Sequence, residues 1–113
     1  VLSKSIVFAA DVTGAVNPHY KTLYDRRNSA FIGSGVVWDK SAVHAGLMSY
    51  VRNLFTRNRI THQAANWGKT SEPKTDAQTM LPLFTRHGMS GLNVAIPLLS
   101  MLAPFELISK ADL

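Results

Sequence analysis

The sequence contains no cysteine. This absence excludes disulfide bonds, thiolate metal sites and cysteine nucleophiles, and it leaves the compartment open, although we favour an intracellular setting, cytoplasmic or organellar. Long apolar runs are also missing, because none reaches the ~18 residues that a membrane span needs. The sequence likewise lacks the G-x-S-x-G pattern of serine hydrolases and the H-x-x-x-H pattern of zinc helices.

Acidic residues are scarce beside basic ones, with 7 against 12, so the net charge is +5. Such a balance is typical of chains that bind nucleic acid, an acidic partner or an anionic membrane. Here the lysines and arginines are scattered, and Arg26-Arg27 is the one basic pair. Binding to RNA or another polyanion therefore rests on charge alone.

The composition predicts a single folded domain over residues 1–113. The chain has 113 residues and is 46% hydrophobic, which is enough apolar material for one core. It starts at Val1, and a strand-like run begins by Ser5. Such a start is typical of a cut piece, a processed subunit or a chain whose beginning is missing.

Four apolar runs predict strands. The first ends at Asp11, so we expect a buried strand that delivers this acid at its carboxyl end. The second contains Gly33 and Gly35, which indicate a bulge or a close backbone approach. The four runs are residues 5–10, 30–38, 60–67 and 92–99, and residues 12–29 and 68–76 are expected to be loops.

Helical periodicity is strongest in the middle of the chain. Ser41 is expected to cap a helix that runs to Asn58 with one apolar face. A second helix is expected over residues 79–87, with Pro82 in its first turn and Gly88 as its C-terminal cap. The apolar positions of the first helix are Val43, Leu47, Val51, Leu54 and Phe55.

The alternation of strands and helices predicts an α/β fold: a three-layer α/β/α arrangement around a mixed, mostly parallel sheet. Sites in such sheets lie at the carboxyl ends of strands. Two places qualify, namely Asp11 after the first strand and Ser100-Met101-Leu102 after the fourth.

Several blocks occur together in the order that one known family has them. Near the C-terminus the chain reads IPLLSM, APFE and SKAD; earlier it reads FAADV from Phe8, NPHY from Asn17 and DRRNSAFIGSGVV from Asp25. These blocks resemble the M18 zinc aminopeptidases, especially their bacterial aminopeptidase 1 branch. The resemblance covers almost the whole chain, and its last block is long and specific.

The resemblance implies a zinc-peptidase-like α/β/α catalytic lobe, interrupted by a second domain that supports oligomerisation. Family enzymes hold two metal ions, zinc or cobalt, with His, Asp and Glu ligands from both halves of that lobe. This chain resembles only the stretch after the interruption, so residues 1–113 are expected to be the C-terminal part of the lobe. The family's first metal-binding His, its bridging Asp and its Glu pair come from earlier sequence.

Within the matched stretch the family supplies two metal ligands. Its Asp falls on Asp11, the metal-binding residue that the resemblance assigns to this chain. Its His falls on Leu102, whose hydrocarbon side chain cannot bind a metal. Two further substrate-side features differ from the family. Where the family has a Gly-rich loop before a threonine, this chain has residues 74–79, which contain no glycine. Where the family has a Gly/Ser-rich segment, this chain has only residues 40–42.

We therefore predict a degenerate, non-catalytic aminopeptidase-like domain, which acts as a structural or interaction subunit in a homo- or hetero-oligomer with other protein chains. No catalytic residue and no cofactor are expected for it. In the alternative hypothesis the chain is a segment of an active zinc metallo-aminopeptidase that removes N-terminal residues from peptides. Asp11 is a metal ligand in that alternative, whereas one carboxylate alone cannot hold zinc and would otherwise cap a loop or pair with an arginine.

The other candidate side chains favour structural roles. Glu106 follows Pro104 and is expected to help begin a further helix. The serines lack a Ser/His/Asp context, and the two tryptophans are expected to be packing anchors or interface residues. The histidines, which have no close ligand spacing, are also expected to be structural. The side chains considered are the histidines His19, His44, His62 and His87, the serines Ser34, Ser100 and Ser109, and the tryptophans Trp38 and Trp67.

Overall fold

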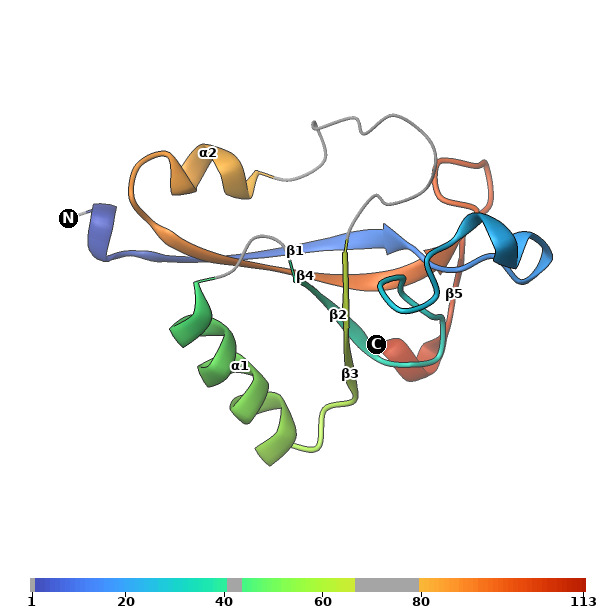
Figure 1. The fold of residues 1–113 in the computed structure, drawn as a ribbon, viewed down its shortest axis with the longest axis horizontal. Helices are drawn as coiled ribbons and strands as arrows, with labels where there is room; N and C mark the ends of the chain where they lie inside the picture. The colour runs from blue at the N-terminus through green and yellow to red at the C-terminus, as the bar shows by residue number, and fades with distance from the viewer. Residues whose placement is uncertain (1, 41–43, 67–79) are drawn as a thin grey trace.

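The computed structural model describes residues 2–40, 44–66 and 80–113, which form one sheet with a helix on each face (Figure 1). The strands are β1 (Ile6–Gly14), β2 (Val36–Asp39), β3 (His62–Ala65), β4 (Ser90–Leu99) and β5 (Leu107–Ile108). The helices are α1 (Ala45–Arg57) and α2 (Leu81–Thr85), with 3-10 turns η1 (Leu2–Lys4), η2 (Pro18–Leu23) and η3 (Lys110–Asp112). The predicted cap Ser41, Trp67 and the segments 68–76 and 74–79 lie outside the described residues.

The sheet is mixed, as predicted. Four strands lie in the order β1-β4-β2-β3, and β5 adds to β4. β1 is parallel to β4 and β2 is parallel to β3, whereas β4 is antiparallel to both β2 and β5. The longest pairing joins β1 and β4, from Ile6 opposite Ser90 to Gly14 opposite Leu98. The α/β class is thereby confirmed.

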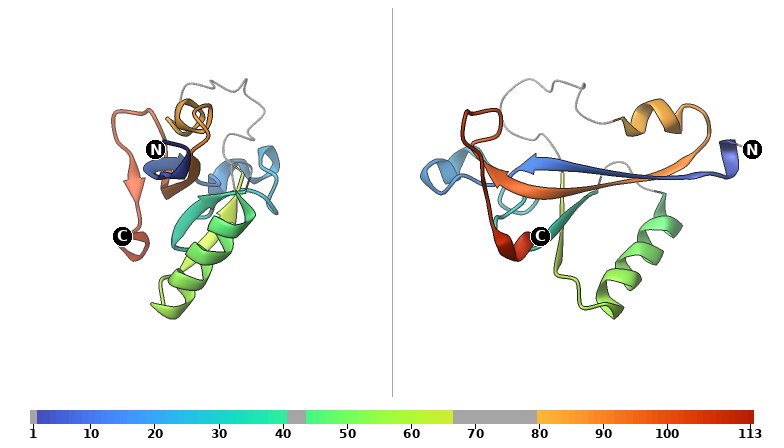
Figure 2. Two further views of the ribbon diagram at one scale, coloured as in Figure 1. Left: turned by 90° about the vertical axis from the view of Figure 1, so that its left-hand side faces the viewer. Right: turned by 180° about the vertical axis from the view of Figure 1, so that it is seen from behind.

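The two helices cover opposite faces of the sheet. Consecutive strand residues point to opposite faces, and Gly91 and Leu92 are neighbours in β4. A Cβ at Gly91 would overlap the side chain of Leu81 in α2, whereas Leu92 packs in the cluster that α1 supplies. Figures 1 and 2 show α1 and α2 on the two sides of the strands. In the described part of the chain no helix is long and apolar enough to cross a membrane.

The main core lies between α1 and the sheet. Half-buried apolar residues surround it, among them Trp38, which is the packing anchor that the sequence predicts. The Trp38 Nε1–H is buried without a hydrogen-bond acceptor in the described structure. The buried members of the cluster are Val51, Phe55, Leu92 and Val94, and a second, smaller cluster joins Ala30, Val37 and Ala65.

The prediction for β1 was wrong in two respects. β1 is an edge strand rather than a buried one, with Ile6 65% and Phe8 55% exposed. It also continues beyond Asp11 to Gly14, because β4 is long enough to pair with it to Leu98. An apolar run indicates a strand, but it does not tell a central strand from an edge strand.

Other boundaries differ for local reasons. The strand predicted from Ala30 begins only at Val36, since left-handed glycines shape a turn before it and Ala30 makes a single bridge to Ala15. Within the described residues α1 begins after His44, which occupies its N-cap position. The helix predicted at Pro104 is absent, and that segment is a turn leading into β5.

The second helix is found, but it is shorter than the predicted range 79–87: α2 spans Leu81–Thr85, and its C-cap residue is Arg86 rather than Gly88. Pro82 lies in the first turn of α2, where its missing N–H costs nothing. Gly88 adopts a left-handed φ of 76° after the helix and donates its N–H to the Thr85 carbonyl at 3.0 Å. The apolar face of α1 buries Val51 and Phe55, while Leu54 remains 44% exposed at its margin.

Candidate metal-site residues at the carboxyl end of the sheet

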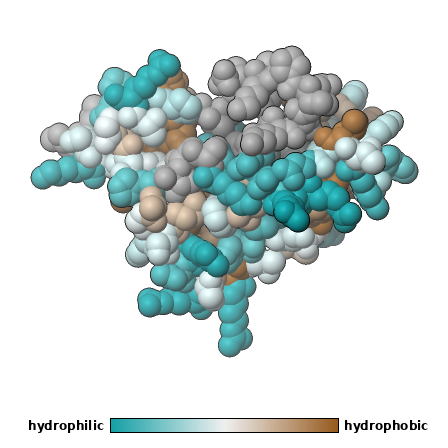
Figure 3. Space-filling view, in the orientation of Figure 1, coloured by the Kyte–Doolittle hydropathy of each residue, from teal (hydrophilic) through white to brown (hydrophobic). Residues whose placement is uncertain are grey.

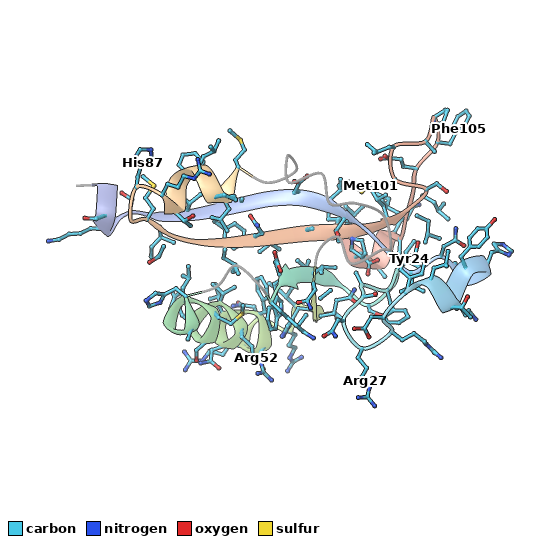
Figure 4. The ribbon with its side chains drawn as sticks, turned by 45° about the horizontal axis from the view of Figure 1, so that its top comes forward. Tyr24, Arg27, Arg52, His87, Met101 and Phe105 are labelled. Atoms are coloured by element: carbon cyan, nitrogen blue, oxygen red, sulfur yellow. The ribbon has the colours of Figure 1, made fainter. Side chains whose placement is uncertain are left out.

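The carboxyl ends of β1 and β4 meet at one end of the sheet, because the two strands are parallel and in register. Beyond this end β4 runs into an exposed turn over residues 100–105, which closes when the Ala103 N–H donates to the Ser100 carbonyl at 3.0 Å. Figure 4 shows Met101 and Phe105 on this side of the molecule and His87 at the opposite end. Both site positions predicted from the sequence, Asp11 and residues 100–102, belong to this end of the sheet.

Asp11 lies within β1, three positions before the strand ends at Gly14. Its register partner is Ala95, and its side chain is exposed. The Asp11 Oδ1 accepts a hydrogen bond from the N–H of Val12 at 2.8 Å. The carboxylate is therefore accessible, and its hydrogen bond to the neighbouring residue leaves further lone pairs for another donor or a cation.

Leu102 stands at the tip of the 100–105 turn and is 83% exposed. Its φ is 67° and that of Ser100 is 60°, so both residues are left-handed. This conformation costs a residue with a side chain about 1–2 kcal/mol, and it clusters at functional loops. The turn thus presents position 102 outward at a conformational cost, but a leucine offers no lone pair there.

Glu106 holds this turn in place. Its Oε1 accepts a hydrogen bond from the backbone N–H of Leu102 at 2.8 Å. β5 follows at once and pairs with Leu98 and Leu99 of β4. Glu106 therefore braces the turn that carries position 102, in place of the helix-initiating role that the sequence suggests.

Asp112 forms a buried clamp that the sequence analysis did not single out. Its carboxylate is 2% exposed and accepts the backbone N–H groups of Gly33 and Gly35, each at 2.6 Å. The Ser109 Oγ accepts the Ala111 N–H at 3.2 Å and so caps the 3-10 turn that carries Asp112. The signal that could have found the clamp is the pair of glycines with one residue between them, which can aim successive N–H groups at an anion.

The two glycines suit this clamp for stereochemical reasons. Gly33 and Gly35 have φ of 80° and 82°, which glycine adopts at no steric cost. A Cβ at Gly35 would also overlap the carbonyl oxygen of Thr61, whereas a Cβ at Gly33 meets open space. The predicted close backbone approach is thus found at Gly35. Gln63 reinforces this region, because its Nε2 donates to the carbonyls of Phe31 at 2.7 Å and Gly35 at 3.0 Å.

The four histidines lie on different elements of the fold. His19 is in η2, His44 is the N-cap residue of α1, and His87 follows α2. The ring of His62 packs against Phe55 with centroids 5.5 Å apart, and its Nδ1 lies 3.0 Å from the Ile60 carbonyl oxygen. Across the described ranges no three His, Cys, Asp or Glu side chains come together as a metal site.

A zinc centre needs more donor atoms than the described residues at this end of the sheet supply. Zinc takes about four ligands, drawn from His, Cys, Asp and Glu side chains and water. In the described part of the chain the carboxyl end of β1 and β4 supplies Asp11, and Leu102 at the tip of the adjoining turn contributes no donor atom. These residues do not fit a complete zinc site by themselves.

Comparison with known proteins shows the family. A family model described as "Aminopeptidase I zinc metalloprotease (M18)" matches residues 1–113. The "Probable M18 family aminopeptidase 1" of Clostridium acetobutylicum is 30% identical over 122 residues, covering 99% of this chain and 26% of the relative. That of Thermotoga maritima is 31% identical over 123 residues, covering 100% of this chain and 27% of the relative. The chain belongs to the M18 aminopeptidase family.

Solved structures of M18 aminopeptidases support the same family assignment. The crystal structure of the M18 aminopeptidase from Thermotoga maritima superposes with a TM-score of 0.85 at 30% identity, covering 98% of this chain and 26% of that one. Aminopeptidase I from Clostridium acetobutylicum gives 0.82 at 27% identity, with 93% and 25% covered. The chain thus spans about a quarter of the length of these relatives, and within that quarter it has their fold.

Proposed function

We propose that residues 1–113 are a domain from the C-terminal part of an M18 catalytic lobe that keeps the scaffold but has lost a metal ligand. On this proposal the domain is non-catalytic and acts as a structural or interaction subunit of a larger assembly. The observation that carries it is Leu102. The family resemblance expects an imidazole at this position, and the side chain here is a hydrocarbon that is 83% exposed.

The surroundings of position 102 support this proposal. The turn is braced by Glu106, continued by β5 and anchored through η3 to the Asp112 clamp. The backbone that would present a ligand is therefore in place, and the ligand atoms are missing. A change limited to one side chain removes metal affinity without disturbing the fold, so the fold can persist after the catalytic function is lost.

The alternative proposal is that the chain is a segment of an active zinc metallo-aminopeptidase. Membership of a family described as zinc metalloproteases favours it, and so does the accessible carboxylate of Asp11. In this alternative Asp11 is a zinc ligand, the other ligands come from outside residues 1–113, and some other group replaces the side chain at position 102.

Metal analysis of the full-length gene product separates the two proposals. We expect fewer than two zinc ions per chain by elemental mass spectrometry and no release of N-terminal residues from peptides. Leu102→His should raise the zinc content, since it restores a donor on the braced turn. Leu83→His is the matched control, because Leu83 is also exposed, at 55%, but lies on α2. Two tightly bound zinc ions together with peptide turnover in the unmodified protein would refute the non-catalytic proposal.

A further inference from the structure

The C-terminal end of α1 carries positive charge and no negative charge. Residues 40–71 contain no Asp or Glu, so α1 has no acid at helical spacing with which its arginines could pair. Arg57 and Arg59 are exposed, and in the described part of the chain they have no carboxylate partner. Figure 3 shows hydrophilic side chains over the lower end of the molecule, where Figure 1 places the end of α1. This end of the helix is therefore an unpaired basic surface.

A shallow groove lies beside this charge on one side of α1. It has a volume of about 180 Å³ and is lined by Tyr50, Asn53, Leu54 and Arg57. These residues are three or four positions apart, so they share one stripe of the helix. Tyr50 is 66% exposed and Leu54 44%, so aromatic and aliphatic surface faces solvent next to a guanidinium. Sites for small molecules are larger, about 300 Å³ or more, so this groove suits one side chain of a partner.

Arg59 occupies a backbone position that helices usually give to glycine. The Ile60 N–H donates to the Phe55 carbonyl at 2.9 Å. The Arg59 N–H donates to the Thr56 carbonyl at 3.2 Å, and the two bonds together form a Schellman C-cap. The first residue after the cap is left-handed in this motif, and Arg59 has a φ of 56°. An arginine is strained there whereas glycine is not, and such strain clusters at binding sites, so the side chain of Arg59 points to a role in binding.

Charge and groove together favour an acidic peptide over other occupants. The chain has a net charge of +5, so a second copy is repelled. Nucleic acid offers phosphates to the arginines but has no aliphatic side chain to pack on Leu54. An acidic peptide that contains an apolar residue supplies both groups, because carboxylates form charge-assisted hydrogen bonds with guanidinium groups and an apolar side chain fills the groove.

We infer that the C-terminal half of α1 is a docking surface for an acidic peptide segment of another protein. An apolar side chain of that segment packs on Tyr50 and Leu54, and its carboxylates bind Arg57 and Arg59. The inference rests on the interaction role in the proposed function, and it names the chemistry of the partner. It does not depend on the loss of a metal ligand.

A designed acidic peptide tests this surface. The peptide is fluorescein-labelled and has about 14 residues, or about four helical turns, with leucines on one face and glutamates on the other. Its N-terminus is acetylated, so that no aminopeptidase activity can shorten it. We expect saturable binding to the full-length gene product by fluorescence anisotropy, and weaker binding as salt is added. A peptide of the same composition with scattered leucines is the matched ligand, and it should bind about tenfold more weakly.

Matched variants locate the binding on α1. Arg57→Gln should raise the dissociation constant about tenfold, whereas Arg27→Gln removes the same charge from an exposed loop and should change it less than about twofold. Figure 4 shows Arg27 on that loop, apart from Arg52 on α1. Tyr50→Ala should also weaken binding about tenfold. Tyr20→Ala is its control, because Tyr20 is 59% exposed but lies on η2, and it should leave binding unchanged.

Arg59→Gly separates a binding role from a structural one. Glycine relieves the left-handed strain, so this variant should unfold at a higher temperature than the parent. Because the guanidinium is lost, the variant should also bind the acidic peptide about threefold more weakly or worse. A more stable variant that binds as tightly as the parent would overturn the part that Arg59 has in the docking.

Other outcomes would overturn the inference as a whole. These are no binding of the acidic peptide, or equal weakening by Arg27→Gln and Arg57→Gln. A third is an oligouridine of the same charge that binds as tightly and is lost in the same variants, and a fourth is a dimer that Arg57→Gln dissociates in sedimentation. Zinc content and peptide turnover are measured separately. An active zinc enzyme that binds the peptide as expected would refute the non-catalytic proposal and leave the docking intact.

Discussion

Two turns of this chain each hold two left-handed residues one position apart, and they do so in contrasting ways. The turn before β2 uses glycine at both positions, Gly33 and Gly35, and directs their N–H groups at a buried carboxylate. The turn after β4 uses Ser100 and Leu102, which bear side chains and pay for the conformation. The first turn is tied to a 2% exposed Asp112, while the second ends in an 83% exposed Leu102.

The two turns differ in the type of residue that occupies the left-handed positions, and this difference distinguishes a turn that serves packing from one that can serve a site. A left-handed position that serves only packing is filled by the residue that adopts it freely, as in the glycine turn. Strained backbone positions cluster at active sites and ligand-binding loops. Under the proposed function, the 100–105 turn retains a backbone that could present a ligand, and Leu102 supplies no donor atom there.

The largest expected effect comes from breaking the clamp. Asp112→Ala leaves the N–H groups of Gly33 and Gly35 buried without their acceptor, so we expect the free energy of unfolding to fall by about 3–5 kcal/mol. Urea denaturation of the full-length protein measures the loss. Asp112→Asn keeps one acceptor oxygen and should lose about half as much. A loss under about 1 kcal/mol for Asp112→Ala would mean that water satisfies the glycines instead.

The next effect tests why glycine is required in that turn. Gly35→Ala forces a Cβ against the Thr61 carbonyl oxygen and also strains the backbone, so we expect a loss of about 2–4 kcal/mol. Gly33→Ala is the control, because its φ is similar but its Cβ would meet open space. It should lose only about 1 kcal/mol. Equal losses for the two variants would mean that the close approach of Gly35 to the Thr61 carbonyl oxygen does not contribute to the requirement for glycine.

Part of this fold follows from sequence pattern. The period of the apolar residues predicts α1, and the run that is apolar apart from Asn93 predicts β4, because a central strand is buried on both faces. Pro82 lies in the first turn of α2 and Gly88 follows shortly after its end at Thr85, and both positions reflect backbone chemistry that is local. Such features depend on residues a few positions apart, so they can be read from the chain.

Other features depend on contacts between distant segments. The clamp joins residues 77 and 79 positions apart, and nothing near Asp112 in sequence indicates its glycine partners. The exposure of β1 depends on which strands lie beside it, which its own apolar run does not encode. At the candidate site the resemblance gave Asp11 and position 102, but the brace from Glu106 emerged only from the folded turn.

A smaller effect is expected from removing the brace. Glu106→Ala takes away the acceptor of the Leu102 N–H in an exposed turn, so the free energy of unfolding should fall by about 1 kcal/mol. Glu106→Gln retains an acceptor oxygen and should stay near the parent value. The sharper readout is hydrogen exchange at the Leu102 amide, which should accelerate in the alanine variant and much less in the glutamine variant. Unchanged exchange in both would show that the turn is held by β5 alone.

The smallest expected effect has the opposite sign and bears directly on the strain at position 102. Leu102→Gly relieves about 1–2 kcal/mol of left-handed strain and costs about 0.5–1 kcal/mol in chain entropy, so it should stabilise the protein by up to about 1.5 kcal/mol. Little packing is lost, since the side chain is 83% exposed. Leu83→Gly, at an exposed position inside α2, should instead destabilise by about 1 kcal/mol. Thermal unfolding of the two variants therefore gives shifts of opposite direction if Leu102 is strained. If it is not, only the entropy cost of glycine remains, and both variants unfold at a lower temperature.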